Sequence, residues 1–239
     1  SNMPIDWLVE AAHDAETSIY PMLQPYYFLE NERRFHTHER ATTEMMRAAA
    51  ANFWDRGADG MYTWFLKWPL GESERRTLTE LSDPGMVKEG DKHYFMNRRA
   101  APADSLGYET LLPIEISVSD TGTPRHVPFY IADDIEGALS RIRQVLLKIR
   151  VANLVSSDRL TLLLNGESLS GETCVRGNGE LIAPYLSMWL DFHLKKVRPR
   201  KGHNLLEIVL DERVHGLTSP IRIEDVEVIV EYGSYPSRL

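Results

Sequence analysis

The chain has 239 residues, of which 43% are hydrophobic and 26% are charged, and its formal net charge is −8. This composition is typical of a globular protein with one large or two small domains, and it excludes disordered, collagenous and disulfide-stapled proteins. The acidic balance argues against a nucleic-acid partner, and no apolar run approaches the roughly 18 residues of a membrane span, so we expect neither nucleic acid nor a membrane as a partner.

Residues 4–99 have the pattern of an α/β segment. A strand is expected over 18–23, where Pro21 limits it to the edge or the end of a sheet. A strong helix is expected over 43–56. The nearly unbroken apolar run 60–66 is typical of a strand buried on both faces, as in a parallel sheet. Strand, helix and strand with short links predict a β-α-β unit. Two further helices are expected over 7–15 and 73–81.

The long helix of this segment has recognisable ends. Thr42 is a good N-cap residue, and Met46, Ala50 and Phe53 recur at helical spacing on one apolar face. Gly57 stands where a left-handed C-terminal cap is expected. These features predict both the bounds of the helix and the face that it buries.

Residues 100–108 are small and polar and are expected to form a linker, and residues 109–239 are expected to be nearly all β. Asn165-Gly166 indicates a tight turn, because both residues tolerate positive φ. Short strands with turns at intervals of about ten residues indicate a β-sandwich. The expected strands cover 112–118, 126–131, 141–151, 160–164, 185–194, 204–210 and 226–232.

Side-chain alternation supports the sandwich. In the strand over 141–151, every second residue from Val145 to Val151 is aliphatic, and Lys148 and Arg150 lie between them. Alternation with a period of two places the aliphatic residues on one face of a strand and the charged residues on the other. The sequence therefore predicts which side chains of this strand reach the core.

Aromatic side chains near the end of the 60–66 strand are candidates for ligand binding. Trp64 and Trp68 lie at or past the strand end, with Lys67 between them. In α/β barrels the carboxyl ends of the strands form the active site, and flat aromatic rings suit the C–H faces of sugars. The alternative is that the rings of this stretch fill a core, as we expect first for Tyr62 and Phe65.

A second group of candidates follows the 18–23 strand. Tyr20, Gln24 and Tyr26 would also lie at the carboxyl end of a strand. The amide of Gln24 could both donate to and accept from sugar hydroxyls. A surface loop with packed tyrosines is the alternative interpretation.

The remaining polar patterns are weaker. His36 and His38 have a spacing found in metal sites, but no third ligand stands at a fixed distance, so we expect a solvated loop instead. The sequence lacks a phosphate-binding loop, a nucleophile-elbow serine and a helical histidine pair, so we expect no cofactor and no metal. Asp59 is expected to build a turn, and Cys174 has no partner for a disulfide. Asp133, Asp134 and Asn165 could bind calcium or a sugar, although such residues more often only build turns. Asp191 and His193 mark either a polar face of a strand or a solvated surface.

A family resemblance rests on several of these segments. From Arg47 to Tyr62, an Ala-rich helix enters the turn Gly57-Ala58-Asp59-Gly60 and then a strand. This stretch resembles the last helix and last strand of bacterial glycoside-hydrolase-like TIM barrels, which often continue through sequences similar to 91–95 into a β-sandwich. The second half resembles jelly-roll, galactose-binding-like accessory domains at 164–166, 202–208 and 225–228.

The resemblance implies a partial TIM barrel followed by a galactose-binding-like sandwich. Only about 95 residues precede the linker, against roughly 200 to 250 in a whole barrel. The chain would then be the C-terminal portion of a glycoside-hydrolase-like, carbohydrate-active protein, with carbohydrate as its ligand. Barrel strands without their neighbours expose edges and apolar faces, so we expect a homo-oligomer.

Two functional hypotheses follow. As an enzyme, the chain would use Glu30 as its carboxylate, and Tyr20, Trp64 and Trp68 would line the sugar subsite. Glycosidic cleavage generally needs two carboxyl groups, and the sequence offers no convincing pair. As a non-catalytic carbohydrate-binding or assembly module, the chain would hold its ligand in the loops of the sandwich. The missing carboxylate pair favours the second hypothesis for the chain as given.

Overall fold

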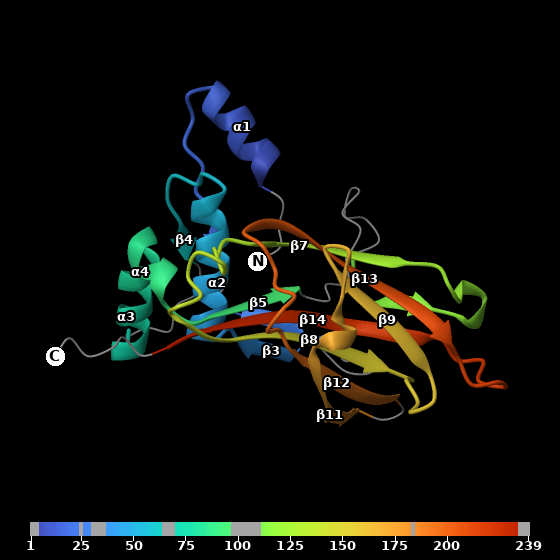
Figure 1. The fold of residues 1–239 in the computed structure, drawn as a ribbon. Coiled ribbons are helices and arrows are strands. Elements are labelled where there is room, and N and C mark those ends of the chain that lie inside the picture. The colour runs from blue at the N-terminus through green and yellow to red at the C-terminus, as the bar shows by residue number, and fades with distance from the viewer. Residues whose placement is uncertain are drawn as a thin grey trace.

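The computed structural model shows two large β-sheets with helices gathered at one end (Figure 1). All strand pairs within the two large sheets are antiparallel. The expectation that the C-terminal half is mainly β is therefore confirmed. The structure describes residues 5–23, 26–29, 37–63, 70–96, 111–182 and 185–233.

The larger sheet contains β5 (Lys92–Met96), β6 (Ile114–Ile116), β8 (Ile142–Ala152), β11 (Thr173–Ile182), β12 (Tyr185–His193) and β14 (Ile221–Tyr232). Its strand order is β11-β12-β8-β14-β5, and β6 pairs with β14 beside this path. The smaller sheet contains β7 (Arg125–Ile131), β9 (Arg159–Leu164), β10 (Glu167–Ser168) and β13 (Gly202–Glu212), in the order β10-β9-β13-β7. Short 3-10 turns, η1 (Val118–Asp120) and η2 (Leu169–Gly171), lie between strands.

One hydrophobic core lies between the two sheets. Every second residue of β8 from Val145 to Val151 is buried, as predicted, and Leu206, Ile208 and Leu210 of β13 are fully buried in the same cluster. The sheets therefore pack face to face, as in a β-sandwich.

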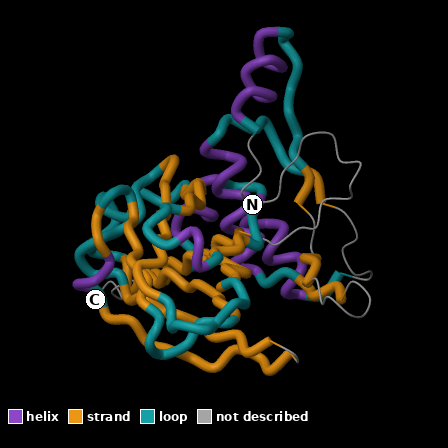
Figure 2. Tube along the Cα trace, turned by 90° about the vertical axis from the view of Figure 1, so that its right-hand side faces the viewer, coloured by secondary structure: helices purple, strands orange, loops and turns teal. Residues whose placement is uncertain are grey.

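The N-terminal elements are α1 (Asp6–Asp14), β1 (Met22–Leu23), β2 (Tyr26–Leu29), β3 (Thr37–Arg40), α2 (Thr43–Asp55), β4 (Tyr62–Thr63), α3 (Glu72–Leu81) and α4 (Pro84–Glu89). Strands β1 and β4 pair in parallel, as predicted, but β2 and β3 as well as α2 lie between them in sequence, so the short link expected from the first strand to the helix is not found. Strands β2 and β3 form a separate antiparallel pair. Figures 1 and 2 show α2, α3 and α4 beside one end of the sheets, whereas α1 projects away.

The predicted ends of α2 are confirmed. The Thr42 hydroxyl accepts a hydrogen bond from the Met45 amide at 3.2 Å, and Gly57 has a φ of +86°. A left-handed conformation costs a residue without a Cβ little, so glycine ends the helix at this point.

Two expectations for the parallel strands are wrong. The first strand is shorter than 18–23, because Pro21 has no amide to donate and the Ile19 amide bonds to the Asp59 carboxylate at 2.7 Å. The second strand is not buried on both faces, because Tyr62 is 53% exposed. In the described part of the chain, β1 and β4 are the parallel pair, and a TIM-barrel sheet is not shown.

Polar side chains join the N-terminal helices to the sandwich. The Asn52 amide donates to the Tyr130 carbonyl and accepts from the Ala132 amide, both at 3.0 Å. The Tyr130 hydroxyl donates to Asp55 at 2.6 Å. Asn52 of α2 thus satisfies backbone groups at the end of β7, which is the last strand of its sheet in the described part of the chain.

Candidate ligand-binding site

Most residues predicted to bind sugar lie outside the part of the chain that the structure describes. Tyr20 is described and is 62% exposed, before β1. Tyr26 lies in β2, but its side chain is outside the described residues. The predicted subsite is therefore neither assembled nor contradicted. The candidates that lie wholly outside the description are Gln24, Glu30, Trp64, Lys67 and Trp68.

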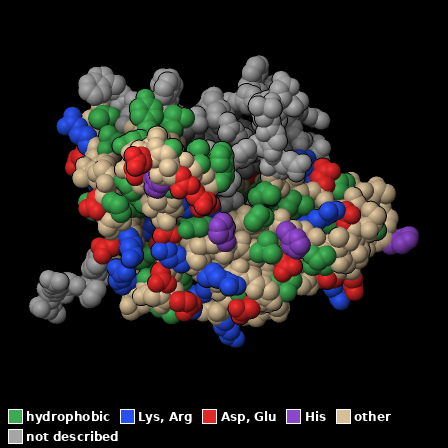
Figure 3. Space-filling model, turned by 90° about the horizontal axis from the view of Figure 1, so that it is seen from above, with side chains coloured by type: hydrophobic (Ala, Val, Ile, Leu, Met, Phe, Trp, Pro, Cys, Tyr) green, Lys and Arg blue, Asp and Glu red, His purple; other side chains and the backbone are tan. Residues whose placement is uncertain are grey.

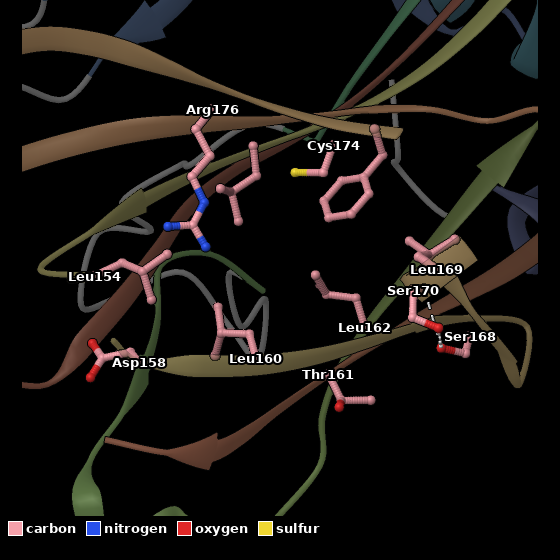
Figure 4. A pocket seen from close by; sticks show the side chains of 12 residues that line it. Leu154, Asp158, Leu160, Thr161, Leu162, Ser168, Leu169, Ser170, Cys174 and Arg176 are labelled. Atoms are coloured by element: carbon pink, nitrogen blue, oxygen red, sulfur yellow. Dashed lines mark hydrogen bonds between the residues drawn. The ribbon is translucent and has the colours of Figure 1, made fainter. Parts of the chain in front are cut away.

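A pocket opens at the side of the sandwich, between β9 with η2 on one sheet and β11 with β12 on the other (Figure 4). Its cavity volume is about 220 Å³. Half of the lining residues have apolar side chains, and the other half carry hydroxyl, thiol, carboxylate or guanidinium groups. The lining residues are Leu154, Asp158, Leu160, Thr161, Leu162, Ser168, Leu169, Ser170, Cys174, Arg176, Leu190 and Phe192.

The pocket exists because an edge strand puts polar residues on the inner face of its sheet. In the β11–β12 ladder, Cys174 lies opposite Phe192 and Arg176 lies opposite Leu190. Leu190 and Phe192 are buried in the shared core, so positions 174 and 176 face the same way. An arginine and a cysteine there leave the core open to one side, where an aliphatic pair would close it.

The charged groups of the pocket differ in their partners. Asp158 is fully satisfied: it pairs with Arg213 at 2.9 Å and accepts from the amides of Val155 and Val214, each at 3.1 Å. Among the described residues, Arg176 has no carboxylate partner, and its guanidinium points over the pocket (Figure 4). Partial burial raises the pKa of the Cys174 thiol, and the positive charge of Arg176 opposes this rise.

The outer face of the larger sheet carries a second polar cluster. Arg150 pairs with Asp225, and His93 contacts Glu227 at 2.9 Å. Burial raises the pKa of Asp225 to about 6, with the neighbouring Glu227 and Glu224 adding to the rise and Arg150 opposing it. A carboxyl group with a raised pKa beside a second carboxylate is an arrangement found in acid–base catalysis.

Burial argues against catalysis at that cluster. Asp225 is 3% exposed and Glu227 is 7% exposed, so a saccharide cannot reach either carboxyl group. The indole of Trp189 on the same sheet face lies 4.7 Å from the Lys148 ammonium, which covers part of the ring. We therefore assign this cluster to the stability of the sheet.

Several weaker candidates have structural roles. Asp59 bonds to His13 at 2.9 Å as well as to Ile19, and it holds the turn after α2 as predicted. Asp134 accepts from the Gly137 amide in a turn. Asp133 is instead buried between strands, where it pairs with Lys92.

Two further candidates, Asn165 and Asp191, lie in a turn and on a sheet face. Asn165 forms the predicted turn, with a φ of +54°, and accepts from the Leu205 amide. Asp191 lies on the outer face of the larger sheet, and its buried Oδ1 has no hydrogen-bond partner among the described residues. Within the described ranges, no group of three or more His, Cys, Asp or Glu residues could hold a metal ion.

Comparison with known proteins identifies no family for this chain. No protein-family model matches the chain, and no curated protein matches it. None of the helices in the described ranges is long and apolar enough to cross a membrane. The pocket at the side of the sandwich is therefore the site from which a function can be argued.

Proposed function

We propose that this chain is the carbohydrate-binding, non-catalytic C-terminal portion of a glycoside-hydrolase-like protein, and that the pocket between β9 and β11 holds the sugar. The single observation behind this proposal is the composition of the pocket wall. Leu160, Leu162 and Phe192 supply an apolar surface, and Ser168, Ser170 and Arg176 supply hydrogen-bonding groups around it.

This lining matches the two-sided chemistry of a pyranose ring. The axial C–H groups of the ring are apolar, and its hydroxyl groups lie around the edge. Small-molecule sites combine an apolar wall with a few polar groups that fix orientation. A cavity of about 220 Å³ lies below the roughly 300–1,000 Å³ of drug-sized sites, which favours a single ring.

The finer fold assignment is part of the proposal. Two antiparallel sheets around one core support a jelly-roll, galactose-binding-like sandwich. The parallel pair β1 and β4, with α2 between them, supports a relation to the end of a TIM barrel. In this proposal, the N-terminal elements are the remainder of a barrel that packs on its accessory domain.

A catalytic role would require carboxyl groups that a sugar can reach. The same-face pair Asp225 and Glu227 is buried and ion-paired, which favours binding over catalysis. The catalytic alternative assigns cleavage to Glu30. If Glu30→Ala abolished a glycosidase activity and left sugar binding intact, the alternative would replace our proposal.

The direct test is calorimetric titration of the chain with a panel of monosaccharides. We expect binding by the wild type and its loss in Ser170→Trp, because an indole at this exposed rim position fills the pocket mouth. Ser140→Trp is the matched control, since Ser140 is also exposed and does not line the pocket. Equal binding by both variants would place the sugar elsewhere, and silence across the panel would reject the proposal.

We also propose that the chain self-associates through its N-terminal elements. Trp7, Tyr20, Met22 and Tyr62 are each at least 50% exposed, and hydrophobic side chains are visible at this end of the molecule in Figure 3. We expect a solution mass of twice 27.4 kDa or more by light scattering.

Two variants test the proposed interface. Trp7→Ser should reduce the mass, whereas Leu139→Ser, which removes an exposed leucine of the sandwich, should not. A monomeric wild type would contradict self-association and the partial-barrel interpretation behind it.

A further inference from the structure

We propose that the pocket selects a sugar that carries a carboxylate, a uronic acid, and that Arg176 is the residue that recognises this group. The inference rests on the proposed function and adds the class of sugar. It goes beyond that function because nothing in a general sugar site requires an anion.

The position of Arg176 is the first step. Arg176 belongs to β11, the edge strand of the larger sheet, and it pairs in register with Leu190. Leu190 is 4% exposed and belongs to the core between the sheets. Arg176 therefore extends from the inner face of the sheet, and Figure 4 shows its guanidinium directed over the cavity rather than away from it.

The missing partner of Arg176 is the second step. The other charged residue of the pocket, Asp158, is committed to Arg213 and to two backbone amides. Within the described residues, Arg176 forms no ion pair, although most arginines of the sandwich do so. A cation at the mouth of a partly apolar cavity attracts an anion more strongly than a fully solvated cation does.

The shape of the guanidinium is the third step. Its planar fork matches a carboxylate through two parallel hydrogen bonds, and such charge-assisted bonds are stronger than neutral ones. The hydroxyls of Ser168 and Ser170 stand on the opposite sheet of the sandwich, 3.0 Å apart. Figure 4 shows Arg176 and the two serines on opposite sides of the cavity, so a sugar ring held there would lie between a cation and two hydroxyls.

The test compares three matched ring compounds. Galacturonate has a ring, hydroxyls and a carboxylate. Galactose lacks the carboxylate, and cyclohexanecarboxylate lacks the hydroxyls. Each compound is titrated into the wild-type chain, into Arg176→Gln and into Arg75→Gln. The last variant is the control, because Arg75 is exposed on α3 and does not line the pocket.

We expect galacturonate to bind the wild type roughly 10- to 100-fold more tightly than galactose, which is the range for one charged hydrogen-bonded pair. Arg176→Gln should remove this preference and Arg75→Gln should keep it. Arg176→Lys should keep part of it, because the charge remains and the fork is lost. Added salt should weaken galacturonate binding more than galactose binding.

The single cysteine supplies an independent readout. Cys174 is exposed and lines the same pocket, so a bound ring should slow its alkylation. The assay is run above pH 8, because the pKa of this thiol is raised. Galacturonate should protect Cys174 in the wild type and should not do so in Arg176→Gln at the same concentration.

The outcomes separate the inference from the proposed function. Equal affinity for galacturonate and galactose, unchanged in Arg176→Gln, would overturn the inference and leave sugar binding in place. Cyclohexanecarboxylate binding as tightly as galacturonate would overturn the sugar function and leave a carboxylate site. If none of the three compounds binds or protects Cys174, the inference is overturned, and the monosaccharide panel then decides whether the proposed function is overturned with it.

Discussion

The sandwich and the N-terminal elements are held together by different kinds of contact. In the sandwich, aliphatic side chains from both sheets form one continuous core, with Val145, Ile149, Leu206 and Ile208 all 3% exposed or less. Such packing is non-directional, and its contribution grows with the apolar area that is removed from water. The sandwich therefore owes its stability to alternation along its strands.

The N-terminal core is smaller and depends on directed polar contacts. Arg47 of α2 pairs with Glu80 of α3 at 2.7 Å, and the Trp54 indole donates to the Leu81 carbonyl at 3.0 Å. Burial opposes the ionisation of Glu80, but Arg47 and Arg76 outweigh it and lower the pKa of this carboxyl. These contacts fix the orientation of the helices, which a small apolar core alone would leave loose.

A buried ion pair lies where the chain passes from α4 into the sandwich. Lys92 of β5 contacts Asp133 at 2.9 Å, and the hydroxyls of Tyr94 and Tyr232 donate to the same carboxylate. β5 lies within the segment expected to be α/β, yet it pairs with β14 in the larger sheet. Polar groups of the sandwich, at Tyr130 and Ala132, thus anchor the N-terminal helix α2.

The largest expected effect comes from removing the shared carboxylate. Asp133→Ala leaves the buried Lys92 charge and two tyrosine hydroxyls without their acceptor, which should lower the free energy of unfolding by about 3–5 kcal/mol. Chemical denaturation measures this loss. Asp134→Ala is the matched control, since its exposed side chain accepts one turn hydrogen bond, and it should cost about 1 kcal/mol. Equal losses would mean that the pair does not anchor β5.

The second prediction concerns pH and tests the sandwich alone. The folded pKa of Asp225 is about 6 against an ordinary value of 3.8, because the carboxyl is buried. The folded state therefore binds this proton more tightly than the unfolded state does, and this group stabilises the fold as pH falls from about 7 to 4. Across that interval, the wild type should gain roughly 2.4 kcal/mol relative to Asp225→Asn.

The pH experiment has an internal control. Glu212→Gln removes an exposed carboxyl at the end of β13 and should follow the wild type across the same interval. Denaturation midpoints at four or five pH values are sufficient. Parallel curves for the wild type and Asp225→Asn would show that Arg150 compensates the burial of Asp225 in full.

The sequence predicts the sandwich better than it predicts the N-terminal region, because the sandwich depends on local patterns. Strand alternation and the Asn165-Gly166 turn depend on near neighbours in sequence, so β8, β9, β13 and β14 were predictable. β11 was missed because Gly177 and Arg176 interrupt any apolar pattern, although this strand builds one wall of the pocket. An inward-facing arginine becomes visible only when the register with β12 is known.

The N-terminal region was harder because its polar contacts join distant residues. Thr42 and Gly57 marked the ends of α2 correctly, since a cap is a local interaction. Nothing in the sequence pairs Asn52 with the end of β7 or Lys92 with Asp133, because such pairs depend on the tertiary fold. The residues predicted to bind sugar were identified from local sequence alone, which does not show which side chains lie close together in the fold. Their role stays a prediction.

The third prediction concerns a variant that weakens the contact between α2 and the sandwich. Asn52→Ala removes two hydrogen bonds to the backbone at the end of β7 and should cost about 2 kcal/mol. Hydrogen exchange should accelerate in α2 and α3 and change little in β8 and β14. Thr79→Ala, which loses an exposed hydroxyl on α3, should alter neither pattern. Uniform acceleration through both regions would mean that they unfold as one unit.

The smallest expected effect on stability comes from replacing one glycine in each region by alanine. Gly57 has a φ of +86°, and a Cβ there would lie 3.2 Å from the Val9 side chain of α1. Gly57→Ala should therefore cost about 1 kcal/mol in strain at the end of α2. Gly171, at the end of η2, has open space around its Cα and no positive φ, so Gly171→Ala should be neutral or slightly stabilising through the unfolded state. Thermal melts of the two variants measure the contrast. Since both replacements add the same methyl group, opposite signs would locate the strain in the turn that joins α2 to β4, and equal shifts would show that this turn relaxes without cost.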